Sequence, residues 1–108
     1  MEVRSFEKEG VVVFQVDGEI NISTSPELKK FYEKHKPKKI VIDLGEVAYV
    51  DSSGLATLVD MLKRTKMQGG VMSLTGMSIK VKSLFEITKL DKLFLICRSQ
   101  DEAVSRIQ

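Results

Sequence analysis

The chain has 108 residues, of which 43% are hydrophobic and 30% are charged, and its formal net charge at pH 7 is +2. This length is near the commonest size of one domain and buries enough surface for a core without cross-links. So small a net charge does not indicate nucleic-acid binding, a single cysteine excludes an internal disulfide, and no apolar run approaches the roughly 18 residues of a membrane span. Because the chain opens with charged residues and no apolar signal segment follows, we expect a cytoplasmic protein without membrane association.

Two strands joined by a tight turn are predicted at the start of the chain. The segments 3–8 and 11–17 read as strands, and only Glu9 and Gly10 separate them. A two-residue connection is typical of an antiparallel hairpin. In the second strand, the period of two places one apolar set on one face, namely Val12, Phe14 and Val16.

A first helix is predicted to begin at Ser25 and Pro26. Serine is a preferred N-cap, and proline is tolerated at the first helical position because an N–H there would have no partner within the helix. Pro37 predicts the end of this helix near residue 36. Its apolar stripe has the spacing i, i+3, i+4, at Leu28, Phe31 and Tyr32.

Strands and helices alternate in the rest of the chain. An apolar strand at 40–44 precedes a helix from Leu55 to about Gln68, which Gly69 and Gly70 end. The apolar stripe of that helix consists of Leu55, Leu58, Val59 and Leu62. The later segments are a strand at 71–74, a helix that Ser78 caps and that runs to about Lys89, a strand at 93–96, and a short helix at 101–107.

This order of elements indicates the α/β class. We expect one domain over residues 1–108 with about four helices and a mixed β-sheet. The antiparallel hairpin opens the sheet, and the later strands are largely parallel because helical crossovers of this length, right-handed by rule, connect them.

The run Asp51-Ser52-Ser53-Gly54 lies where an apolar strand ends and an amphipathic helix begins. The first N–H groups of a helix have no partner in the helix, and together with the helix dipole they favour negative charge. A serine at this turn is therefore a candidate to carry a phosphoryl group. The alternative is that one of these polar residues simply caps the helix.

An enzyme is poorly supported by the sequence. The only histidine, His35, is flanked by lysines at a helix end, and no metal-binding pair or phosphate-binding glycine loop is present. The lysines between 29 and 39 are interpreted as a solvated helix face, since few aromatic residues alternate with them. We therefore expect no catalytic residue, no metal, no cofactor and no direct nucleic-acid contact.

From residue 11 to 104, the sequence resembles the STAS domain family, and within it the bacterial anti-sigma factor antagonists. Most of the chain is covered, with the matching segments in the expected order. These segments are Gly18-Glu19-Ile20, Val41-Ile42-Asp43-Leu44, Tyr49-Val50-Asp51-Ser52-Ser53-Gly54-Leu55, Gly69-Gly70, Leu84-Phe85 to Leu90, and Leu93-Phe94.

The resemblance implies a regulatory switch. In the family, the serine after the aspartate, here Ser52, is phosphorylated by an anti-sigma factor that is also a serine kinase using ATP. The unmodified antagonist binds the anti-sigma factor and frees sigma, the phosphorylated form releases it, and a PP2C-like phosphatase reverses the modification. A weak homodimer is a further expectation.

The resemblance also implies which residues contact the partner. Family members often carry an acid after Gly-Glu-Ile, whereas this chain has Asn21, which leaves the role of the segment 18–21 open. The residues assigned to the partner surface are Asp51, Ser52, Ser53, Gly54, Leu55, Gly18, Glu19 and Asn21.

The helix after Ser52 has a second face. Angular spacing places Thr57, Asp60, Met61 and Arg64 opposite the leucine stripe. Thr57 and Met61 are therefore candidate partner contacts, and the alternative for Met61 is an isolated exposed methionine. Two other functions compete with the switch: a constitutive adaptor or scaffold, and a domain that binds a nucleotide or another anion at the helix start.

Overall fold

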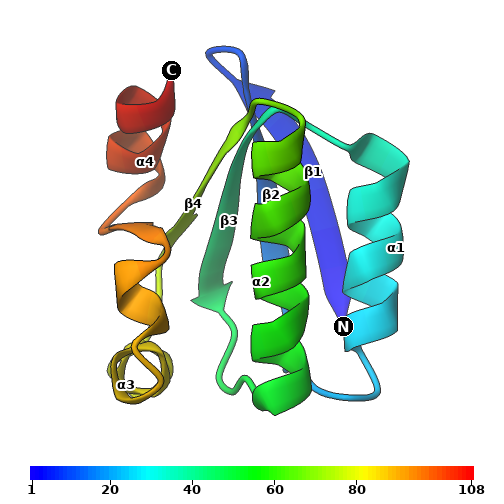
Figure 1. Ribbon diagram of the computed structural model, residues 1–108, viewed down its shortest axis with the longest axis vertical. Helices are drawn as coiled ribbons and strands as arrows, with labels where there is room; N and C mark the ends of the chain where they lie inside the picture. Colours follow the sequence, from blue (N-terminus) through cyan, green and yellow to red (C-terminus); the bar gives the residue numbers. More distant parts are fainter.

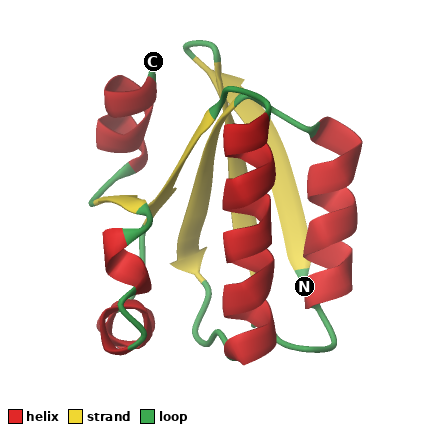
Figure 2. Cartoon of the chain, viewed as in Figure 1, coloured by secondary structure: helices red, strands yellow, loops and turns green.

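Five strands form one mixed β-sheet in the order β1-β2-β3-β4-β5 (Figures 1 and 2) in a computed structural model that describes residues 1–108. The strands are β1 (Glu2–Lys8), β2 (Val11–Asp17), β3 (Lys39–Glu46), β4 (Val71–Thr75) and β5 (Leu95–Cys97). The helices are α1 (Ser25–His35), α2 (Ser52–Met67), α3 (Ile79–Ile87) and α4 (Gln100–Ile107), with a short 3₁₀ helix, η1 (Leu90–Lys92), before β5. β1 and β2 are antiparallel and all other neighbours are parallel, which confirms the predicted class and sheet.

The tight turn between β1 and β2 has the backbone conformation of a two-residue hairpin. Glu9 and Gly10 both have a positive φ, 53° and 81°, as in a type I′ turn, whose twist matches that of the flanking strands. The register pairs Lys8 with Val11 at the turn. The two-residue connection therefore indicated the correct pairing.

Helices cover both faces of the sheet. α1 and α2 lie side by side on one face (Figure 1), where Phe14, Ile42 and Leu58 belong to a core of 19 buried residues. α4 covers a second cluster of 7 buried residues, which includes Val13 and Val104. Because successive strand residues point to opposite faces, β2 is buried on both sides. The apolar face predicted from the sequence, with Val12, Phe14 and Val16, is therefore only one of the two buried faces of β2. None of the helices has the length and apolar character that a membrane crossing requires.

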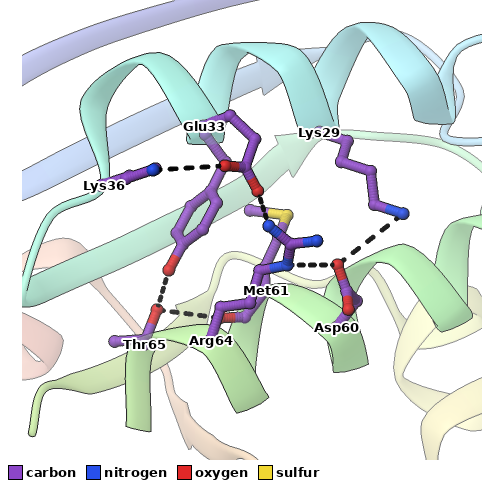
Figure 3. A network of polar contacts seen from close by, with 8 residues as sticks. Lys29, Glu33, Lys36, Asp60, Met61, Arg64 and Thr65 are labelled. Carbon is purple, nitrogen blue, oxygen red and sulfur yellow. Dashed lines mark hydrogen bonds and ion pairs between the residues drawn. The ribbon is translucent and has the colours of Figure 1, made fainter. Parts of the chain in front are cut away.

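The interface between α1 and α2 has a buried hydrogen-bond chain (Figure 3). Thr65 Oγ1 donates to the carbonyl of Met61 at 2.8 Å and accepts from the Tyr32 hydroxyl at 2.6 Å. Exposed ion pairs flank this chain: Lys29–Asp60 (3.7 Å), Arg64–Asp60 (3.0 Å), Lys36–Glu33 (3.8 Å) and Arg64–Glu33. Each exposed pair contributes only about 0–1 kcal/mol, so the buried contacts hold the two helices together.

The start of α1 differs from the prediction by one residue. Thr24 is the N-cap, and Ser25 is already the first residue of the helix. The reason is a turn at Asn21, whose backbone carbonyl accepts from the Ser25 N–H at 2.8 Å, so helical hydrogen bonding begins earlier. The Ser25 hydroxyl is left buried without a hydrogen-bond partner.

Other boundaries differ as well: β3 extends to Glu46, two residues past its predicted end, and α3 ends at Ile87 instead of about Lys89. α2 begins at Ser52, three residues before the predicted Leu55, because Asp51 caps it. β5 begins two residues later than the predicted 93–96 strand and ends at Cys97, because η1 and the residues after it occupy the preceding segment. α3 begins as predicted, with Ser78 as its N-cap.

Candidate functional site

Asp51 organises the start of α2 with both of its carboxylate oxygens. Oδ1 accepts from the N–H of Gly54 at 2.9 Å, the hydrogen bond of an N-cap. Oδ2 accepts from the N–H of Ile22 at 3.0 Å, which ties the helix to the loop before α1. Because Asp51 caps the helix, the hydroxyl groups of Ser52 and Ser53 are not used as caps.

Ser52 is exposed as the first residue of α2. The backbone N–H groups of Ser52 and Ser53 have no acceptor within the domain. These free donors and the positive end of the helix dipole favour negative charge at this position. The structure thus places an exposed hydroxyl where an added phosphoryl group is electrostatically tolerated.

The segment 18–21 lies directly against the residues that precede α2. The N–H of Gly18 donates to Glu46 at 3.1 Å and the N–H of Ile20 donates to Tyr49 at 3.0 Å. In return, the N–H of Asp51 donates to the carbonyl of Ile20 at 3.1 Å. The fold therefore brings together the two sequence segments that the resemblance assigns to the partner surface.

Asn21 supports the loop before α1. Its Oδ1 accepts from the N–H groups of Ser23 and Thr24 at 2.9 and 3.1 Å, and its Nδ2 donates to Glu19 Oε1 at 3.3 Å. A carboxylate could accept the first two bonds, but it would face Glu19 with like charge. The local hydrogen bonds therefore explain why an amide can stand here in place of the acid that is common in the family. The Asn21 amide keeps the bonds of the turn and donates to Glu19, where a carboxylate would repel it.

Gly54 and Leu55 are corrections to the predicted partner surface, because both are buried. A Cβ on Gly54 would lie 2.4 Å from the carbonyl oxygen of Ile20 and 2.8 Å from Val50. Glycine is needed there so that the 18–21 segment can approach the helix. These residues support the exposed turn from below and offer little surface to a partner.

Thr57 and Met61 are corrections too. Thr57 is 7% exposed and Met61 is fully buried. Met61 lies at the edge of the leucine stripe and belongs to the same core cluster, and Thr57 lies against α1 residues; Asp60 and Arg64, which do face away from the stripe, remain accessible. The exposed methionine of α2 is Met67, at 86%.

Two exposed apolar residues beside Ser52 were not predicted. Ile22, whose N–H is bound by Asp51, is 73% exposed. Tyr49 is also exposed, and the ammonium of Lys80 lies 5.8 Å from its ring centroid. The loop between β2 and α1 contains two isoleucines, of which Ile20 is buried and Ile22 is exposed, so the sequence alone did not single out Ile22. Both side chains add exposed apolar surface to this end of the molecule.

A cavity of about 330 Å³ lies between the N-terminal parts of α1 and α2, and we call it the α1–α2 notch. Its lining contains one cation and no acid. The lining residues are Ile22, Ser25, Pro26, Lys29, Ser53, Ala56 and Thr57.

His35 is far from this region. It lies in the last turn of α1, and α1 and α2 run in the same direction (Figure 1), so His35 and Ser52 are at opposite ends of the helix pair. His35 Nδ1 is 2.9 Å from the carbonyl of Phe31, and the two rings stack at 4.6 Å. This histidine cannot activate Ser52 within one molecule. No three His, Cys, Asp or Glu side chains gather as a metal site.

Comparison with known proteins relates the chain to a defined group. The family model described as STAS domain matches residues 3–103. The chain is 32% identical over 105 residues to the anti-sigma-B factor antagonist of Listeria monocytogenes, covering 94% of this chain and 91% of that relative.

Solved structures show the same relation. An anti-sigma factor antagonist from Mycobacterium paratuberculosis aligns with a TM-score of 0.88 and 26% identity, over 98% of this chain and 92% of the other. The Bacillus cell fate determinant SpoIIAA in its phosphorylated form shares the fold, with a TM-score of 0.73 and 15% identity, over 99% and 100% of the two chains.

Proposed function

The chain belongs to the STAS domain family, and we propose that it is an anti-sigma factor antagonist whose binding is switched by phosphorylation of Ser52. The observation that carries the proposal is the exposed Ser52 hydroxyl at a helix start whose cap is already supplied by Asp51. The relative in Listeria monocytogenes is named an anti-sigma-B factor antagonist. The fold itself occurs in a phosphorylated state in SpoIIAA.

In this proposal, the partner is an anti-sigma factor that is also a serine kinase. It docks on the surface formed by Ser52, Ser53, Glu19, Ile22 and Tyr49, and binding frees its sigma factor. The kinase transfers the γ-phosphoryl group of ATP to Ser52 Oγ, with loss of the hydroxyl proton and release of ADP. A PP2C-like phosphatase removes the group by hydrolysis. The antagonist itself supplies no catalytic group.

Release follows from charge rather than refolding. A phosphoserine carries about −1.5 to −2 charges at neutral pH. In the free domain, the helix start tolerates this charge, whereas in a closed interface it must be desolvated beside Glu19 and Asp51. A tenfold loss of affinity needs only about 1.4 kcal/mol, so no change of fold is required.

Titration calorimetry with the cognate anti-sigma factor tests the proposal. Ser52→Asp should weaken binding by at least about tenfold, because it adds a charge at the interface. Ser52→Ala should keep the affinity of the unmodified protein. Ser105→Asp adds the same charge on the exposed surface of α4 and should leave binding unchanged. Equal binding by Ser52→Asp and the wild type would instead indicate a constitutive adaptor.

A further inference from the structure

We propose that the outer edge of β1 pairs in antiparallel register with the same edge of a second copy of this chain. The two five-stranded sheets then join into one across a twofold axis at Ser5. This interface is independent of the switch at Ser52, because Ser52 follows β3, which lies two strands away from the β1 edge.

The outer edge of β1 has no partner within the domain, since β1 is the first strand of the sheet and β2 is its only neighbour. Lys8 and Val11 flank the two-residue turn and form a hydrogen-bonded pair, so the bonds to β2 recur at every second residue back along β1. The backbone N–H and C=O groups of Val3, Ser5 and Glu7 therefore point outward, and no other segment of the chain hydrogen-bonds to them. A free edge of 7 residues is a template for another strand.

The side chains of β1 favour one antiparallel register with a second β1. With the axis at Ser5, each Arg4 lies opposite the Phe6 of the other copy, and each Glu2 lies opposite the Lys8 of the other copy. A guanidinium beside an aromatic ring and an opposite-charge pair are both favourable cross-strand neighbours. All residues of β1 are then paired, and the outward backbone groups of both copies face each other.

The neighbouring registers are poorer. Moving the axis to Arg4 places the two Arg4 side chains opposite each other, and moving it to Phe6 places Arg4 opposite Lys8. Like charges directly opposite each other destabilise a strand pair. Both shifts also leave one end of β1 unpaired, and larger shifts pair still fewer residues. Lys8 already pairs with Asp101 of its own chain, so the preference rests mainly on Arg4 and on the length of the ladder.

Apolar side chains flank the edge on both faces of the sheet. Phe6 is 41% exposed, on the face that also carries Val13. On the other face, the half-buried Phe31 stacks on His35, whose Nε2 is 3.4 Å from Ser5 Oγ. A second copy that pairs with β1 therefore covers apolar surface on both sides of the edge, and this burial favours association.

Sedimentation equilibrium of the whole chain tests the pairing, and we expect a reversible dimer whose population rises with protein concentration. Ser5→Pro removes the outward N–H at the axis, on which two intermolecular hydrogen bonds depend, and spares the bonds to β2. The dimer dissociation constant should therefore rise about tenfold or more. Ser5→Ala is the matched control, because it keeps the N–H, and it should change the constant by less than about twofold. A wild type that stays monomeric up to about 1 mM, or equal constants for the two variants, overturns the proposal.

Cysteine cross-linking tests the register and needs no proline in β1. In the proposed register, the two Ser5 Cα atoms are directly opposite at about 5.5 Å, within the reach of a disulfide. The two Glu7 Cα atoms are about 14 Å apart, because each lies opposite Val3 of the other copy, four residues away. Under mild oxidation, Ser5→Cys should form a disulfide-linked dimer and Glu7→Cys should not, while the buried Cys97 is common to both. Any other pattern contradicts an axis at Ser5.

Discussion

The first turn of α2 and its middle differ sharply, although both belong to one helix. In the first turn, Ser52 is exposed and its N–H is free. About one and a half turns on, Thr57 is buried, and about two and a half turns on, Met61 is buried in the main core. The difference shows that the candidate function is confined to the end of the helix, while the rest of the helix holds that end in place. Substitutions along α2 should therefore separate into those that change stability and those that change binding.

The largest effect on stability is expected for Met61→Ala in the middle of α2. Removing a fully buried side chain costs the transfer free energy and leaves a cavity, about 2–5 kcal/mol in total. Met67→Ala is the matched control on the same helix, because Met67 is 86% exposed, and it should change stability by less than about 0.5 kcal/mol. Urea unfolding measures both, and equal values would contradict the burial of Met61.

Gly54→Ala tests the junction between the two regions. A Cβ would lie 2.4 Å from the Ile20 carbonyl oxygen, so the 18–21 segment or the helix must shift. We expect a loss of about 1–3 kcal/mol or more, as for overpacked sites. Ser53→Ala, one residue earlier, should be nearly neutral. Unfolding of Gly54→Ala at the wild-type urea midpoint would show that this close approach is absent.

Asp51→Ala should have an intermediate effect. The change removes the N-cap bond to Gly54 and the bond to Ile22, and loss of a cap alone costs about 0.5–2 kcal/mol. Asp51→Asn retains an oxygen that can accept one of these bonds, so its loss should be smaller. Hydrogen exchange should also speed up at the Ile22 amide in Asp51→Ala, and unchanged protection there would contradict the tie between loop and helix.

The smallest effect is expected for Asn21→Asp in the loop beside the first turn. The introduced carboxylate can accept from Ser23 and Thr24 as the amide does, but it faces Glu19. Because the pair is near solvent, the loss of stability should stay within about 0.5 kcal/mol and shrink at high salt. Unfolding free energies at low and high salt check this, and a salt-independent loss would point to a broken turn instead.

The features that the sequence predicted correctly are those that depend on residues close together in the chain. Glu9 and Gly10 indicated the hairpin, Ser78 indicated the start of α3, and the run at 51–54 indicated a helix start with an exposed serine. In each case the outcome depends on the backbone and hydrogen bonds of neighbouring residues.

Features that depend on packing were not predicted. The period of a helix does not tell how wide its covered face is, so Met61 and Thr57 were placed in solvent although both are buried. Ser25 was placed one residue outside the helix because the turn at Asn21 was not visible in the sequence. The α1–α2 notch arises only when two helices that are distant in sequence lie side by side.

The most direct test of the switch is phosphosite mapping by mass spectrometry after incubation of the domain with its cognate anti-sigma factor kinase and ATP. The account predicts addition of a single phosphoryl group, located on Ser52 and absent from Ser52→Ala. Phosphate on any other residue, or none from a kinase that binds the domain, would contradict it.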